Sequence, residues 1–226
     1  MDTLKIISIA SLSFSVLCAV VIAADILGGH RQKMAIMNWV WPITAIWSGP
    51  FGLWAYFRFG RAPRSQSVPG AEANTKRRKP AWQTITVGDL HCAAGCTLGD
   101  VAGEWLVFLT GITVAGSALL TDYLVDFVLA YAAGIVFQYF AIAPMRKLFG
   151  WPGILAAIKA DTVSLVAFEI GMFLWMGFTH EILFRPPLKP TDPTYWFMMQ
   201  IAMAVGFVTA YPANMWLIRK GLKESM

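Results

Sequence analysis

Cys92 and Cys96 are the residues whose types and spacing most favour chemistry. They stand four positions apart, so on a helix both thiols project from the same face. His91 directly precedes the pair, and thiolate and imidazole groups are ligands that suit Cu(I) and Zn(II). The pattern predicts a soft-metal site with His91, Cys92 and Cys96 as ligands, and copper is the only cofactor that the sequence indicates. The same spacing also fits inert cysteines on a closely packed helix.

Carboxyl groups continue the row that the two cysteines begin. Asp100 and Glu104 follow Cys96 at the same four-residue interval, and a third acid, Glu169, stands within a later apolar segment. Carboxylates are costly inside a membrane, and where they occur they mark ion or proton pathways. We therefore expect Asp100, Glu104 and Glu169 to form an ion or proton pathway.

A second set of soft ligands follows Glu169 in the same segment, namely Met172, Met176 and His180.

 The spacing from Glu169 onward places these three side chains on one helical face. Thioethers select Cu(I) over hard cations, so the stripe extends the predicted soft-metal path. Methionine is also an ordinary gap-filler in apolar helices, and packing explains the stripe equally well.

The elements that position these residues must lie in a membrane. Of the 226 residues, 57% are hydrophobic and only 14% are charged, whereas a soluble domain carries about 25% charged residues. The apolar runs are continuous and do not alternate, which predicts helices. The sequence therefore predicts an all-α, polytopic membrane helix bundle with six transmembrane helices. The expected spans cover residues 4–27, 34–57, 88–120, 122–143, 161–184 and 195–218.

The spacing of these spans divides the chain into three parts. Residues 1–57 are expected to form a two-helix membrane hairpin, and residues 88–226 a four-helix membrane module that carries the His/Cys/acid motif. Residues 58–87 are rich in Arg, Lys, Pro and Ser, which predicts a basic, flexible, cytoplasmic linker. The net charge of +5 is carried mainly by loops between apolar runs, which favours contact with the lipid bilayer over nucleic-acid binding.

Loop charges also predict an orientation. Outside the linker, Arg146, Lys147 and Arg219 fall on the same expected side as Lys5, whereas few basic residues fall on the other side. Because cytoplasmic loops carry the excess of Lys and Arg, both termini are expected in the cytoplasm. The predicted location is a multi-pass position in a bacterial inner membrane. In this orientation the thiols lie towards the inner face, the acids midway and the thioethers outside, as a cation path requires.

Gly95, Gly99 and Gly103 repeat every four residues on a face beside the cysteine row. Small residues at this spacing let another helix approach closely. We expect this face to contact a second helix, and a homo-oligomer or a membrane partner is one candidate for it.

Three functions fit these observations. The first is an integral membrane protein that binds and transports, or hands over, a soft metal ion, with Cu(I) favoured. The second is a proton- or cation-coupled transporter of a small solute that uses the intramembrane carboxylates. The third is a non-catalytic membrane scaffold subunit. The chain has no Walker loop, dinucleotide fingerprint or zinc-protease motif, so a function other than catalysis is favoured.

The motif also carries a family resemblance. Residues 91–104 (HCAAGCTLGDVAGE) and 161–172 (DTVSLVAFEIGM), together with Trp175 and Met176, resemble a bacterial membrane-protein family catalogued as domain of unknown function 4396. The resemblance covers about residues 85–220, and members of the family are sometimes labelled copper oxidases. It implies a four-helix module with a His/Cys/acid motif, and it implies no reaction.

Overall fold

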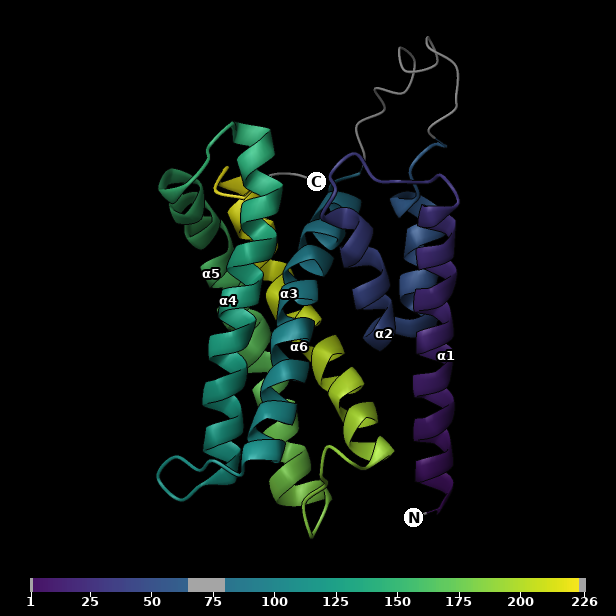
Figure 1. Ribbon diagram of the computed structural model, residues 1–226, viewed down its shortest axis with the longest axis vertical. Helices are drawn as coiled ribbons and strands as arrows, with labels where there is room; N and C mark the ends of the chain where they lie inside the picture. Colours follow the sequence, from purple (N-terminus) through teal and green to yellow (C-terminus); the bar gives the residue numbers. More distant parts are fainter. Residues whose placement is uncertain (1, 65–79, 224–226) are drawn as a thin grey trace.

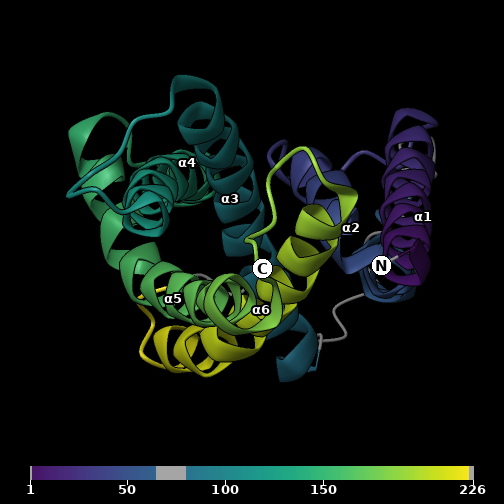
Figure 2. The same cartoon turned by 90° about the horizontal axis from the view of Figure 1, so that it is seen from below.

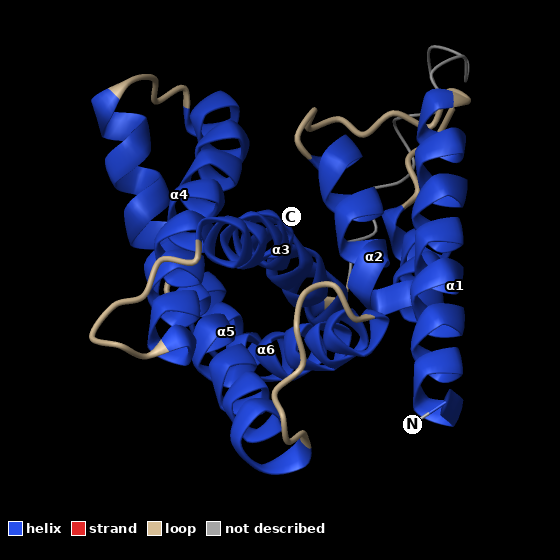
Figure 3. Ribbon diagram, turned by 60° about the horizontal axis from the view of Figure 1, so that its bottom comes forward, coloured by secondary structure: helices blue, strands red, loops and turns tan. Residues whose placement is uncertain are grey.

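The computed structural model describes residues 2–64 and 80–223, and these residues form a bundle of long helices (Figure 1). Part of the expected basic linker, residues 65–79, lies outside the described residues. The helices are α1 (Asp2–Leu27), α2 (Met37–Ala55), α3 (Ala81–Thr110), α4 (Ala118–Arg146), α5 (Trp151–Phe178) and α6 (Pro193–Arg219). Two π-helical turns, η1 (Tyr56–Gly60) and η3 (Thr179–Leu183), continue α2 and α5. The described residues contain no strand, as Figure 3 shows by its colouring.

Within the described residues, five helices are long and apolar enough to cross a membrane, namely α1, α3, α4, α5 together with η3, and α6. Large apolar side chains such as Leu17, Val128 and Leu174 stay more than half exposed on the outside of the bundle. A lipid environment covers such a surface, whereas water would not. The predicted all-α membrane helix bundle is confirmed, and the chain is a membrane protein.

The helix bounds differ from the expected spans at several ends. Helix α3 begins at Ala81, inside the expected linker, and ends at Thr110, because Gly111 adopts a left-handed conformation with φ of 64°. That conformation is the usual helix stop and suits glycine. Helix α5 begins at Trp151, well before the expected residue 161. Residues 151–160, which lie between two expected spans, are therefore helical.

Helix α3 is the most enclosed of the five long helices, because 61% of the residues in its most apolar stretch are buried. It contacts α2, α4, α5 and α6, while α1 and α2 lie along one side of the bundle (Figure 2). The glycine face of α3 packs against α4. A Cβ atom added to Gly95 would lie 2.7 Å from the Cα of Gly134, and one added to Gly99 would overlap the backbone of Ala130. The face expected to contact a second helix therefore contacts α4 of the same chain.

Helix α2 does not follow the expected second crossing. It turns back at Gly49, which has φ of 50° and ψ of −123°, a conformation essentially limited to glycine. The two arms then lie side by side: the Trp41 ring packs against Tyr56 and Phe59 at centroid distances of 5.6 and 6.2 Å. Helix α2 is accordingly a re-entrant hairpin, and it is absent from the helices that are long and apolar enough to cross.

The tip of this hairpin is completed by α6. Pro50 has no backbone N–H, so it cannot donate to the carbonyl of Ile46 four residues earlier. The side-chain amide of Gln200 donates to that carbonyl instead, at 2.7 Å, and also to the Ser15 hydroxyl at 3.1 Å. Non-helical backbone at membrane depth requires such protein partners, so Gln200 allows the chain to reverse there.

The reversal changes the arrangement of the chain ends. The carbonyl of Gly60 accepts a hydrogen bond from the side chain of Gln32 at 3.0 Å, so both ends of α2 lie on one side of the bundle. Five helices of the described residues are then long and apolar enough to cross, and the start of α1 and the end of α6 lie at opposite ends of the bundle (Figure 1). The sequence predicted both termini on one side. The difference arises because the segment with Pro42, Gly49 and Pro50 turns back instead of crossing.

Candidate ion and proton site

The row predicted on α3 faces the interior of the bundle along its whole length. Cys92, Cys96, Asp100 and Glu104 are all buried, and the most exposed of them, Glu104, retains only 5% of its surface. The four-residue spacing places them along one side of the helix, as the sequence predicted. Both cysteines are free thiols.

Helix α5 places Glu169 against this row. Helices α3 and α5 are in contact, and the Glu169 carboxyl lies close enough to Cys96 and Asp100 to interact with both electrostatically. Glu169 is 1% exposed. The contact between the two helices, which the predicted pathway requires, is therefore present.

The polar side chains at the middle of the row lack hydrogen bonds within the described part of the chain. Both carboxyl oxygens of Asp100 and both of Glu169 are buried and have no hydrogen-bond partner of ordinary geometry among the described residues, and the Cys96 thiol lies beside Glu169. The His91 ring is buried as well, beside the backbone of Phe137, and it packs edge-on against the Phe137 ring. Buried polar atoms nearly always have a partner, and leaving one unpaired costs about 1–3 kcal/mol. The unpaired oxygens are atoms to which a proton or a cation can bind.

One end of the row opens into a cavity of about 460 Å³. Glu104 lines this cavity, and the side chains of Tyr195 and Asp126 lie beside its carboxyl. Asp122 and His180 also line it. Glu104 therefore connects the cavity to the unpaired carboxyl groups deeper in the bundle.

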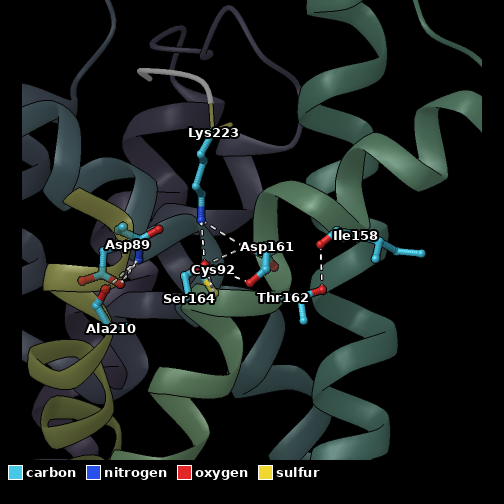
Figure 4. Close-up of polar contacts among 9 residues, drawn as sticks. Asp89, Cys92, Ile158, Asp161, Thr162, Ser164, Ala210 and Lys223 are labelled. Atoms are coloured by element: carbon cyan, nitrogen blue, oxygen red, sulfur yellow. Dashed lines mark hydrogen bonds and ion pairs between the residues drawn. The ribbon is translucent and has the colours of Figure 1, made fainter. Parts of the chain in front are cut away.

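The other end of the row is closed by a buried ion pair (Figure 4). The Lys223 ammonium donates to Asp161 Oδ1 at 2.9 Å and to the Ser164 hydroxyl at 3.2 Å. The Ser164 hydroxyl in turn donates to the Cys92 sulfur at 3.7 Å. Beside this group, the amide of Asn214 donates to Asp89 Oδ1 at 2.7 Å.

The predicted metal ligands are only partly brought together. Cys92 and Cys96 lie near each other on α3, but among the described residues no group of three or more His, Cys, Asp or Glu side chains is arranged to hold a metal ion. Met172 and Met176 are buried on α5. His180 lies in η3, partly exposed, with Glu181 as its partner at 3.0 Å. The expected stripe therefore ends in a local contact between His180 and Glu181 at the edge of the cavity.

Sequence reasoning missed several members of the site. Asp126 was identifiable, because it is a carboxylate inside an apolar segment. Asp161 and Asp89 carried a weaker signal, since each stands near the start of an apolar run. Lys223 carried none, because it follows α6 among other basic residues and its partner is far away in the sequence.

Comparison with known families agrees with the motif. A family described as a domain of unknown function (DUF4396) matches residues 81–223, more than half of the chain. The chain belongs to this family. The DUF4396 region comprises α3 to α6 and Lys223, and so contains the whole row from the cavity to the buried ion pair. No curated protein matches the chain, and no solved structure matches it.

Proposed function

We propose that this protein is a multi-pass transporter of the bacterial inner membrane. It moves protons or a small cation along the carboxyl groups of Glu104, Asp100 and Glu169, and this movement is coupled to a small solute bound in the cavity. One observation carries the proposal: Asp100 on α3 and Glu169 on α5 lie close to one another, and all four of their carboxyl oxygens are buried and unpaired among the described residues. Carboxyl groups in such surroundings serve as proton and ion sites in membrane transporters.

The arrangement supports a path with two ends. The cavity reaches Glu104 at one end, and the cluster around Asp161 closes the other. Basic residues flanking the helices gather at the end of the closed cluster, among them Arg31, Arg146 and Arg219. By the positive-inside rule that end is cytoplasmic and the cavity faces outward.

A flux assay tests the proposal. Purified protein is reconstituted into vesicles that contain a pH-sensitive dye, and proton entry is followed after a voltage is imposed. Glu169→Gln and Asp100→Asn should each lower the initial rate roughly 100-fold, since each removes a group that exchanges protons. Glu181→Gln is the matched control, because that carboxyl is 64% exposed and outside the row.

The outcome separates this function from its alternatives. If the control and both interior variants carry protons, sodium and potassium at equal rates, the proposed row has no function in transport. The double variant Cys92→Ser/Cys96→Ser should remain active, because the thiols are not required to exchange the proton or cation.

A soft metal ion is the second candidate. It is favoured by the two free thiols that lie near each other on α3, since paired thiolates select Cu(I). The protein would be purified under reducing conditions and loaded with Cu(I), with Cys92→Ser/Cys96→Ser alongside. About one copper per chain, lost in the double variant, is the result expected for a thiolate site. Copper content that is equal in both proteins would remove this candidate.

A further inference from the structure

The side chain of Lys223 is completely enclosed, although it belongs to a short segment that follows the last membrane helix. Its side-chain exposure is 0%, and that of its partner Asp161 is 1%. Lysine is almost never fully buried unless it is paired. Figure 4 shows the chain of Lys223 running straight down between Asp89 and Asp161 towards Cys92 and Ser164.

The turn that ends α6 directs this side chain inward. Gly221 has φ of 69°, and the N–H of Leu222 then donates to the carbonyl of Leu217 at 3.0 Å. Glycine at this position of a helix end allows the chain to reverse direction. The reversal returns Lys223 to the bundle, whereas the neighbouring Lys220 stays exposed.

The surroundings of the ammonium are those of a cation site. Asp161 Oδ1 and the Ser164 hydroxyl accept its hydrogen bonds. The second oxygens of Asp161 and Asp89 are buried and have no partner among the described residues, so the cluster offers more acceptors than Lys223 uses. Burial lowers the pKa of Lys223, but the adjacent Asp161, Cys92 and Asp89 together outweigh burial and raise the pKa above its ordinary value of 10.5. The side chain therefore remains a cation.

We infer that Asp161, Ser164 and Asp89 form a site for a small monovalent cation, and that Lys223 occupies it as a tethered ammonium group. The inference rests on the proposed function only for its consequence, which is that Lys223 competes with the transported cation at the inner end of the row. A buried ion pair gains little net stability, because desolvation of both charges offsets their attraction. Exchange of the tethered ammonium for a free cation is therefore energetically accessible.

Thermal unfolding of the purified full chain tests the site. Lys223→Met removes the ammonium and keeps most of the side-chain length, and Lys220→Met is the control on the same segment. Ammonium chloride is the probe, and tetramethylammonium chloride at equal concentration reports the effect of ionic strength. In Lys223→Met, ammonium should raise the unfolding temperature by about 5 °C at 100 times its dissociation constant. The native chain and Lys220→Met should show no such rise.

A second pair of variants covers the case in which Lys223→Met does not fold. The double variant Lys223→Met/Asp161→Asn removes both charges together, so it should fold and lose the response to ammonium. Lys223→Ala purified in ethylammonium chloride should recover the folded protein, because the free ammonium replaces the missing one. If neither ammonium nor ethylammonium affects Lys223→Met or Lys223→Ala, Lys223 has only a structural role and the inference is overturned.

Failure of this inference and failure of the proposed function give different results. A response to ammonium in Lys223→Met without flux in any variant would retain the cation site and remove transport. Flux in the native chain that Lys223→Met leaves unchanged, together with no response to ammonium, would retain transport and remove the site. If both hold, Lys223→Met should raise the initial rate of ammonium uptake several-fold over the native chain.

Discussion

Polar side chains are buried both in the α1–α2 region and in the α3–α6 region, but they are paired differently. In the first region Tyr56 donates to Asp25 at 2.8 Å, and Thr44 donates to the carbonyl of Val40 at 2.9 Å. The Trp47 indole nitrogen is the exception among the described residues of that region. In the second region no described residue hydrogen-bonds to a carboxyl oxygen of Asp100 or Glu169.

The difference separates stability from function. Paired polar groups hold a re-entrant hairpin in a membrane, where unpaired backbone is costly. Unpaired carboxyl groups contribute nothing of this kind, and natural proteins keep such groups at functional sites. We therefore expect substitutions in the first region to lower stability, and substitutions of the unpaired carboxyl groups to change transport.

The largest expected effect concerns the packing that encloses the unpaired carboxyl groups. A Cβ atom at Gly99 would overlap the backbone of Ala130, so Gly99→Leu should destabilise the fold by about 3 kcal/mol or more. Ala102→Leu is the control, since Ala102 is exposed on the same helix. Recovery of monodisperse protein in detergent measures the effect. Equal recovery of the two variants would contradict the close contact of α3 and α4.

The next effect concerns the turn of the re-entrant hairpin. Gly49→Ala forces alanine into a conformation that suits glycine, and its Cβ would lie 2.9 Å from the Ser15 hydroxyl. The expected loss of unfolding free energy is about 1–3 kcal/mol. Adding Ser15→Ala removes the contact but leaves the backbone strain, so the double variant should stay less stable than Ser15→Ala alone. Equal stability of those two proteins would show that the backbone conformation is not required.

A matched pair of leucine substitutions compares the two regions directly. Gln200→Leu leaves the carbonyl of Ile46 unpaired and should lower the unfolding free energy by about 1–3 kcal/mol. Glu169→Leu removes two unpaired oxygens, so it should leave stability unchanged or raise it by about 1 kcal/mol. Denaturant unfolding in mixed micelles measures both. A loss of similar size in both variants would mean that Glu169 has a structural partner.

How much of this could be predicted from the sequence depends on the range of the interactions. The long apolar segments and the buried row on α3 follow from hydrophobicity and four-residue spacing, both of which are local. The reversal of α2 does not, because Pro42 and Pro50 occur in helices that cross as well as in helices that turn back. What decides the reversal is the conformation of Gly49 and the contact with Gln200 on a distant helix.

The site shows the same limit. Cys96 and Asp100 were predictable, because their spacing places them on one face of one helix. Glu169 was identifiable by its cost in a membrane, yet its contact with that face depends on how α5 packs. The pairing of Lys223 with Asp161 depends on the turn after α6 and on three-dimensional packing, which the local pattern of the sequence does not contain.

The smallest expected effect concerns a hydrogen-bonded polar group at the edge of the α3–α6 region. It tests whether such a group stabilises the fold as paired groups do in the α1–α2 region. Asp192 begins α6, and its carboxylate accepts a hydrogen bond from the N–H of Thr194 at 2.9 Å, which lowers the pKa of Asp192 below 3.8. A lowered pKa stabilises the fold above the ordinary pKa, and the contribution is lost as the pH falls through the folded-state pKa. Asp192→Ala should therefore cost about 1 kcal/mol at neutral pH and progressively less in acid.

Ser117 provides the matched control for this prediction, because it begins α4 and its hydroxyl accepts from the N–H of Leu120 at 3.2 Å. A hydroxyl does not titrate in acid, so Ser117→Ala should cost a similar amount at every pH. Unfolding of both variants between neutral and acidic pH measures the difference. If the unfolding free energies of Asp192→Ala and the native chain differ by the same amount at every pH, the charge of the Asp192 carboxylate contributes nothing. If the two free energies converge in acid, Asp192 behaves as an ordinary capping carboxylate, and the unpaired carboxyl groups are limited to the interior of the region.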